Sequence, residues 1–181
     1  MRSLRGQLLV ASPALLDPNF RRTVVLIGEH GEEGAMGLVL NRPSVTTVAE
    51  AVPDLDGVAR GSDPVYVGGP VAPSVIMVLA EFDEPDEAGM LVARDIGFLG
   101  EAREINDLGA STRGARVFAG YAGWGPGQLD EEVKRSDWIV NAPEAAEILS
   151  EEPEELWPAV LDRMGGQFSL LARMPPDPSM N

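Results

Sequence analysis

The apolar residues of this chain fall into short runs that are rich in Val, Leu and Ile and bounded by Gly, Pro or Asn. Runs of this kind are typical of β-strands. Three of them open the sequence, at residues 6–11, 22–30 and 35–41. The segment GEEG at 31–34 joins the last two runs. The sequence therefore predicts a β-hairpin with His30 at its end, beside the turn.

More strands and several helices are predicted along the rest of the chain. The predicted strands are residues 64–71, 74–82, 115–124 and 137–143. The predicted helices are residues 47–52 with Thr46 or Thr47 as the cap, a segment beginning near Pro126, and residues 143–152 and 153–166. Residues 90–114 are ambiguous: GMLVARDIGFLG is strand-like, and the polar segment after it gives no assignment. Because no repeat or linker divides the chain, we expect one α+β domain over residues 1–181, with an irregular tail at 172–181.

Charge and composition exclude several classes of function. Lys and Arg number 14 against 29 Asp and Glu, a formal net charge of -15. This charge opposes direct binding to nucleic acid or to an anionic membrane, because both require clustered basic residues. The absence of cysteine excludes disulfides and thiolate chemistry. The apolar stretches are shorter than a signal core of about 7 residues or a membrane helix of about 20, so we expect a cytoplasmic protein.

His30 is the only histidine, and it stands beside Glu29. An undescribed hydrolase or transferase would use Glu29 and His30 as an acid/base pair. Residues 29 and 30 of a continuous strand point to opposite faces, however, and no HExxH spacing provides a second metal ligand. We therefore favour a structural role for His30 near the turn. No metal site and no cofactor are predicted.

The glycine-rich segment GYAGWGPGQLDEE, at 120–132, has the strand, loop and helix start of a phosphate-binding loop. Pro126 and Gly127 stand where a Walker motif needs Lys and Ser or Thr, and Asp130 replaces the third glycine of a dinucleotide motif. A tight turn with a capped helix is the better interpretation. Trp124 within it either closes the core or anchors a partner, and we favour the core.

The segment LDPNFRRTVV contains Asp17, Arg21 and Arg22, a mixed-charge cluster in an acidic chain. Asp17 is expected to cap a turn and to pair with an arginine. The alternative is that these residues recognise an acidic partner or a carboxylate. Both interpretations remain open from the sequence.

Several long motifs resemble the YqgE/AlgH family of small bacterial proteins. They are SPALLDPNFRRTVVLIGEHGEEGAMGLVLNRP, VYVGGPV, GYAGWGPGQLDEEV, the tryptophan of SDWIVNAP, and ELWPAVLDRMGG. The resemblance implies a single α+β domain whose bifurcated, mostly antiparallel sheet folds toward a pseudo-barrel with flanking helices. It implies no established enzymatic activity or cofactor. The family name reflects a regulatory role proposed in alginate biosynthesis.

Residues and resemblance together favour a noncatalytic binding or regulatory protein that acts through a protein or small-molecule partner. The polar and aromatic signature positions would line one shared groove if the two motif regions pack together. The binding candidates are Asp17, Arg21, His30, Asn41, Tyr121, Trp124 and Gln128. A closed polar pocket where carboxylates converge on His30 would instead favour an enzyme.

Overall fold

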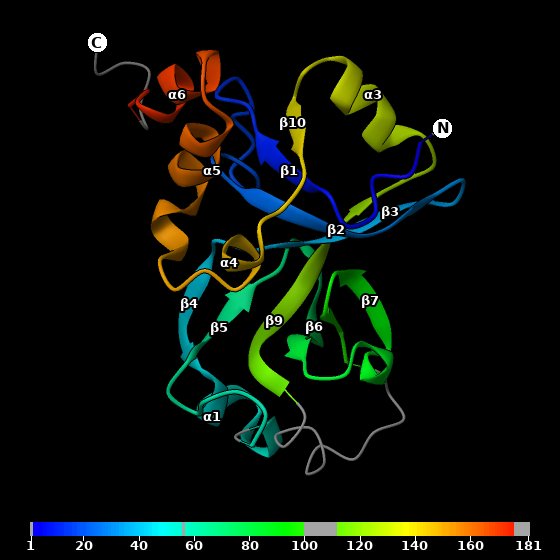
Figure 1. Ribbon diagram of the computed structural model, residues 1–181, viewed down its shortest axis with the longest axis vertical. Helices are drawn as coiled ribbons and strands as arrows, with labels where there is room; N and C mark the ends of the chain where they lie inside the picture. Colours follow the sequence, from blue (N-terminus) through cyan, green and yellow to red (C-terminus); the bar gives the residue numbers. More distant parts are fainter. Residues whose placement is uncertain (1, 56, 100–111, 176–181) are drawn as a thin grey trace.

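The computed structural model describes residues 2–55, 57–99 and 112–175, and Figure 1 shows their arrangement. The strands are β1 (Leu8–Ala11), β2 (Val24–Gly31), β3 (Gly34–Val39), β4 (Pro43–Thr47), β5 (Pro64–Val67), β6 (Val71–Phe82), β7 (Met90–Ala93), β8 (Ile96–Phe98), β9 (Thr112–Trp124) and β10 (Trp138–Asn141). The α-helices are α1 (Val48–Ala51), α3 (Gln128–Lys134), α4 (Ala145–Ile148), α5 (Leu156–Met164) and α6 (Gln167–Ala172). Short 3-10 helices are η1 (Pro53–Leu55), η2 (Pro85–Glu87) and η3 (Pro153–Glu155).

The strands form one ten-stranded sheet whose main path is β10-β1-β2-β3-β9-β6-β8-β7, with β4 pairing β5 beside it. Strand β5 runs parallel to β9, and the other described pairs are antiparallel. In the described part of the chain β10 and β7 do not pair with each other, so the sheet stays open. The expected folding toward a pseudo-barrel is therefore wrong, whereas the expected α+β class with a large antiparallel sheet is confirmed.

Strand β9 connects the two halves of the sheet, rising in Figure 1 from the lower strands to β2 and β3. One edge of β9 pairs with β6. The other edge pairs first with β5, at Phe118 and Ala119, and then with β3, from Ala122 to Trp124. The segment after β5 crosses β9 so closely that a Cβ on Gly68 would lie 2.3 Å from the carbonyl oxygen of Gly120. This close approach explains the glycine in the motif GGP.

The two faces of the upper strands are buried in two separate cores. Leu8 and Val10 of β1 face a core that includes residues of α5 and α6, whereas Leu9 and Ala11 face the core under α3. Successive residues of a strand point to opposite faces, so a run in which all four residues are buried needs cover on both sides. That cover comes from α5, α6 and strands of the lower half, such as β8 with Phe98, on one face, and from α3 on the other.

A third core fills the lower half of the molecule. Val48 of α1 and Leu55 of η1 pack with Ala80 and Phe82 of β6 and with Val117 of β9. Figure 1 shows α1 below β4 and β5, at the end of the molecule away from α3 and α6. The two faces of β9 are therefore covered by different elements: α1 packs with Val117 on one face, and α5 and α6 belong to the core around Phe118 on the other.

Most of the expected elements are confirmed, including the hairpin in which His30 lies next to the β2–β3 turn. Thr47 is the N-cap of α1, in a capping box with Glu50. Sequence reasoning missed β4 and the helix α6, which reaches Ala172 at the start of the expected tail. Strands β7 and β8 lie in the ambiguous, strand-like segment GMLVARDIGFLG. Of the ambiguous stretch 90–114, residues 100–111 lie outside the described residues, as do residues 176–181 of the tail.

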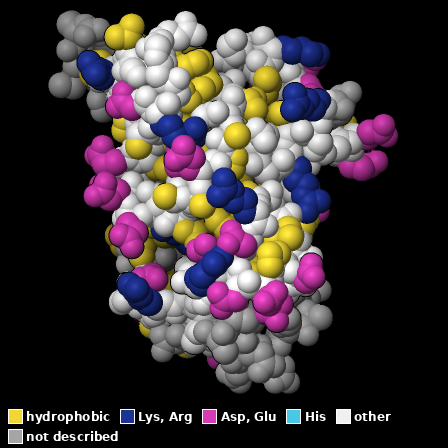
Figure 2. Space-filling view, viewed as in Figure 1, with side chains coloured by type: hydrophobic (Ala, Val, Ile, Leu, Met, Phe, Trp, Pro, Cys, Tyr) yellow, Lys and Arg dark blue, Asp and Glu magenta, His cyan; other side chains and the backbone are white. Residues whose placement is uncertain are grey.

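Among the described helices none is both long and apolar enough to cross a membrane. The face shown in Figure 2 carries acidic and basic side chains interspersed with one another. The net negative charge of the chain is therefore compatible with local positive sites. Two groups of arginines, described below, form such sites.

Candidate functional site

The loop between β1 and β2 is shaped by Asp17. The backbone amide of Asn19 donates to Oδ1 of Asp17 at 2.8 Å, and the amides of Phe20 and Arg21 donate to its carbonyl oxygen at 3.0 and 2.7 Å. An aspartate that accepts from the amide two residues later forms an Asx turn. Among the described residues Asp17 makes no ion pair with an arginine, so its role here is the turn.

Asn41, at the end of the β3 segment, holds the far side of this loop. Its Oδ1 accepts from the amide of Val24 at 2.9 Å, and its Nδ2 donates to the carbonyl oxygen of Arg22 at 2.9 Å. Arg22 has a φ of 55°, a left-handed conformation that costs a non-glycine residue about 1 kcal/mol. The buried amide of Asn41 therefore holds a strained residue in place, next to the exposed Arg21.

Three arginines meet at this loop, and we call Arg21, Arg22 and Arg42 the arginine surface. Arg42 donates to the carbonyl oxygen of Arg21, and Arg22 donates to that of Met174 while its guanidinium lies 4.4 Å from the ring centroid of Trp157. Burial, and then repulsion from Arg21, lower the pKa of Arg22 and of Arg42. Within the described ranges no carboxylate pairs with any of the three.

The second motif region is organised around the carboxylate of Glu132 on α3. Its Oε2 accepts from the indole nitrogens of Trp124 and Trp138 at 2.9 and 2.8 Å, and its Oε1 accepts from Nε2 of Gln128 at 2.9 Å. The Oε1 of Gln128 in turn accepts from the amide of Gly125 at 3.1 Å. Trp124 is only 6% exposed, so it belongs to the core, as the favoured interpretation expected.

Phe20 joins the arginine loop to this cluster. Its ring lies 6.1 Å from that of Trp124 in a stacked arrangement and 5.6 Å from that of Trp138 in an edge arrangement. Such aromatic pairs stabilise by about 1 kcal/mol beyond the area they bury. The two signature regions therefore do pack together, but their contact is an aromatic core and not an open groove.

His30 has a side chain that is 1% exposed. The amide of Leu4 donates to its Nδ1 at 3.0 Å, and its Nε2 lies 3.6 Å from Oδ2 of Asp130. Because Nδ1 accepts a hydrogen bond, the neutral ring carries its proton on Nε2, facing Asp130. Neither nitrogen has a lone pair free to take a proton from a substrate.

The remaining candidates lie apart from one another. Glu29 is exposed, and no described hydrogen bond or ion pair joins it to His30, so the structure does not assemble the acid/base pair. Tyr121 is half-buried and packs against the core on the opposite face of β9 from Trp124. A search of the described residues finds no group of three or more His, Asp and Glu side chains that could hold a metal ion.

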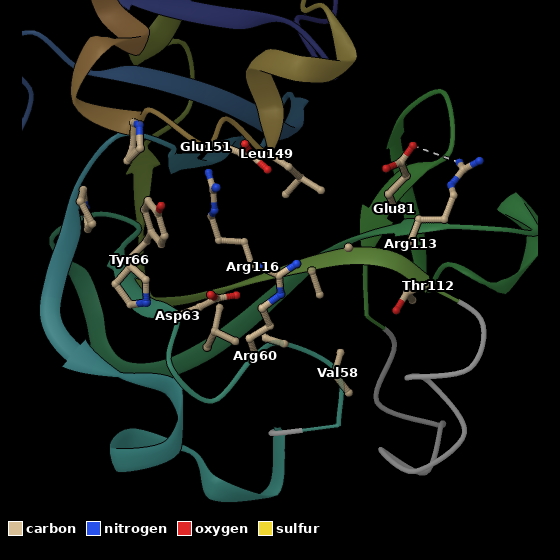
Figure 3. A pocket seen from close by; sticks show the side chains of 17 residues that line it. Val58, Arg60, Asp63, Tyr66, Glu81, Thr112, Arg113, Arg116, Leu149 and Glu151 are labelled. Carbon is tan, nitrogen blue, oxygen red and sulfur yellow. Dashed lines mark ion pairs between the residues drawn. The ribbon is translucent and has the colours of Figure 1, made fainter.

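A cavity of about 860 Å³ opens in the lower half of the molecule, and sequence reasoning missed it entirely. Its walls come from β5, from β9, from the loop 58–63 and from the segment 149–153 (Figure 3). Apolar side chains in the lining include Val58, Ala59 and Leu149. The charged lining residues are Arg60, Asp63, Glu81, Arg113, Arg116 and Glu151. A volume of this size is within the range of about 300 to 1,000 Å³ found for small-molecule sites.

The only sequence signal for this cavity was an arginine inside an apolar strand. Arg116 interrupts the run ARVFAGYAGW, and a charge in such a run either pairs or faces a polar space. In the structure its guanidinium stacks on the ring of Tyr66, 4.3 Å from the centroid. Burial lowers the pKa of Arg116 and raises that of Tyr66.

The arrangement defines a class of protein: a single α+β domain with a large, mostly antiparallel sheet that is not closed into a barrel and with a few helices packed on it. A family model described as DUF179, AlgH-like, matches residues 8–169. The chain belongs to the AlgH-like family.

Relatives and solved structures agree with this assignment. A UPF0301 protein of Streptomyces coelicolor is 42% identical over 185 residues, covering 99% of this chain and 96% of its own. A UPF0301 protein of Chlorobaculum tepidum is 34% identical over 180 residues, covering 97% and 95%. The solution structure of the AlgH protein from Pseudomonas aeruginosa is 31% identical, with a TM-score of 0.73 and coverage of 96% and 95%. The crystal structure of a Corynebacterium diphtheriae protein shares the fold, with a TM-score of 0.87 at 23% identity and coverage of 96% and 93%.

Proposed function

We propose that this chain is a noncatalytic binding protein that recognises an acidic partner protein through the arginine surface. The observation that carries the proposal is the cluster of Arg21, Arg22 and Arg42, which no described carboxylate neutralises although the chain carries a charge of -15. Three adjacent positive charges repel one another, and an anionic partner relieves that repulsion.

The rigidity of the loop supports a recognition role. Asp17 and Asn41 hold its backbone from two sides, and Phe20 anchors it in the aromatic core. A loop that is held in one conformation loses little entropy when it binds, which favours affinity. Guanidinium groups also bind carboxylates in a bidentate geometry that gives specificity as well as attraction.

A regulatory role through a partner protein fits these features better than a transcription factor or an enzyme. The net charge of -15 repels duplex DNA, and the arginine surface has three cations where a DNA-binding face needs many more. Nδ1 of His30 accepts from the amide of Leu4, and no described contact joins His30 to Glu29, so the acid/base use of this pair receives no support from the geometry.

The test is capture of partners from a lysate of the native host by the wild-type protein and by an Arg21→Glu/Arg42→Glu variant. Arg22 stays unchanged because its guanidinium packs on Trp157. Arg94→Glu is the matched control, since Arg94 is exposed and lies on the distant β7–β8 turn. We expect one protein to bind the wild type and the control stoichiometrically and to be lost from the double variant, with affinity that falls as salt rises. Equal capture by all three variants would refute the proposal.

The transcription-factor alternative has its own measurement. At about 0.15 M salt we expect duplex DNA to bind this protein no better than it binds an unrelated acidic protein. Sequence-specific binding at submicromolar concentration would overturn the assignment to a protein partner.

A further inference from the structure

The cavity in the lower half contains a guanidinium group, that of Arg116, which the described residues satisfy only in part. Nη2 of Arg116 donates to the carbonyl oxygen of Ser150 at 2.6 Å. Nη1 of the same group is buried and has no hydrogen-bond partner among the described residues. No described carboxylate lies within ion-pair distance of this guanidinium either.

Arg113, at the other end of the same cavity, shows the opposite situation. Its guanidinium pairs with Glu81 at 3.1 Å, with Asp83 at 3.8 Å and with Asp95. Figure 3 shows the pair with Glu81 pointing away from the space around Arg116. The positive charge of Arg113 is therefore already balanced by the protein, and it does not call for a ligand.

Arg60 lines the same end of the cavity as Arg116. It is exposed, and in the described part of the chain it forms no ion pair. Figure 3 places its side chain beside that of Arg116, across the opening from Leu149 and Glu151. Both arginines line the same cavity, and guanidinium groups are suited to binding a planar or tetrahedral anion.

Two carboxylates in the lining limit the charge that the site accepts. Asp63 and Glu151 line the same cavity, and Asp63 is near enough to raise the pKa of Arg116 slightly against the larger effect of burial. A ligand with a second negative group would meet these carboxylates. The apolar part of the lining, which includes Val58, Ala59, Val117 and Leu149, favours an uncharged hydrocarbon body for the rest of the ligand.

We propose that this cavity binds a small molecule with a single carboxylate or phosphate group on an apolar body, the anion bound by Arg116 and Arg60. The site is separate from the arginine surface, so the chain combines a small-molecule site with a protein-binding surface. Tyr66 supports it, because Cζ of Arg116 lies over its ring at 4.3 Å from the centroid.

The experiment uses three probes with the same ring and different head groups, namely benzoate, phenyl phosphate and neutral benzamide, measured by calorimetry and by NMR shifts of the full chain. We expect saturable binding of benzoate if the natural ligand is a carboxylate, or of phenyl phosphate if it is a phosphate, and none of benzamide. Arg116→Met should weaken the binding about tenfold, the factor given by loss of one charge-assisted hydrogen bond.

Arg60→Gln should weaken the same binding by a smaller factor, and Arg94→Gln should leave it unchanged. Because Arg60 is exposed, its substitution preserves the fold and decides the question if the Arg116 variant is unstable. The proposal fails if neither anionic probe binds, if benzamide binds equally well, or if binding survives both substitutions. The variants leave Arg21 and Arg42 intact, so this failure is distinct from failure of partner capture.

Discussion

The cluster around Glu132 in the upper half and the surroundings of Arg116 in the lower half treat their polar groups in opposite ways. Around Glu132 both carboxylate oxygens accept hydrogen bonds, from two indoles and one amide. Around Arg116 one nitrogen of the guanidinium is buried and has no partner among the described residues. The carboxylate of Glu132 therefore finds all its donors within the chain, whereas Nη1 of Arg116 still lacks an acceptor.

This difference changes how the signature residues should be interpreted. Trp124, Gln128, Asn41 and Asp17 are polar or aromatic residues of the kind that mark binding sites, yet their described contacts build the fold. Satisfied buried groups stabilise a unique structure, whereas unsatisfied ones are costly and call for an explanation. The comparison therefore directs the search for ligands away from these satisfied residues and toward the arginines that have no described carboxylate partner.

The largest effect is expected for Trp124→Ala. The substitution removes a 6% exposed ring from the aromatic core and takes one hydrogen-bond donor from the carboxylate of Glu132. The free energy of unfolding should therefore fall by about 3 to 5 kcal/mol. Chemical denaturation measures this directly. Trp124→Phe, which keeps an aromatic ring but lacks the N–H donor, should lower the free energy of unfolding much less. An unchanged melting temperature in the Ala variant would instead make Trp124 a recognition residue.

Asn41→Ala comes next. It leaves the amide of Val24 and the carbonyl of Arg22 without their side-chain partner, and it frees a backbone held at a φ of 55°. We expect a loss of about 2 kcal/mol in the free energy of unfolding. The exposed Asn19→Ala, in the same loop, is the control and should change stability by less than about 0.5 kcal/mol. Similar values for the two variants would mean that the loop does not depend on Asn41.

His30→Ala should have a moderate and local effect. Loss of the acceptor for the amide of Leu4 should cost about 1 kcal/mol and should speed hydrogen exchange at that amide. His30→Asn retains an acceptor oxygen in nearly the place of Nδ1 and should restore much of the protection. If both variants lose hydrolytic activity on any substrate while the fold is intact, His30 is catalytic and this interpretation is wrong.

Arg116→Met tests whether the guanidinium of Arg116 serves the fold. It replaces a cation that has no described carboxylate partner with an apolar side chain of similar length. We expect the free energy of unfolding to change by less than about 1 kcal/mol. Arg163→Met is the matched control, since Arg163 binds Glu147 at 2.6 and 2.9 Å and is satisfied within the chain. The control should lose more stability. A larger loss at Arg116 would show that its charge serves the fold.

The smallest effect concerns the ionisation of Tyr66. Burial raises its pKa, and the charge of Arg116 lowers it by a smaller amount, so Arg116→Met should move ionisation to still higher pH. A group whose pKa is raised by folding adds stability that is present below the unfolded pKa of about 10 and is lost as pH rises through the folded value. Tyrosinate absorbance in a Tyr121→Phe background reports Tyr66 alone, because the chain has two tyrosines. Ionisation at lower pH in the variant would contradict the stacked geometry.

Local patterns were enough to predict the strands and the capped helix at Thr47, because alternating burial and cap chemistry act over a few residues. They did not show that the sheet stays open. That outcome depends on how β9 divides one edge between β5 and β3, a pairing of residues far apart in the sequence. Strands β7 and β8 could be predicted only as an ambiguous strand-like segment, because runs of three or four residues carry too little pattern to separate two strands.

The candidate site was harder to predict than the fold. The sequence drew attention to Asp17, Arg21 and Asn41, and the structure places all three at one loop. It gave no sign that Tyr66 and Arg116 would stack, because β5 and β9 pair across about 50 residues of chain. A cavity forms between elements, so its lining has no continuous sequence pattern.

The order of the strands also shapes the path by which a newly made chain reaches this structure. β1, β2 and β3 leave the ribosome first, yet β3 is paired by Trp124 and its neighbours, and β1 by residues up to Asn141. Until those late strands emerge, both outer edges of the early sheet are open to pairing with other nascent chains. Exposed Glu32 and Glu33 at the hairpin tip give such early sheets a shared negative charge. Mutual repulsion would then protect each chain during its own synthesis.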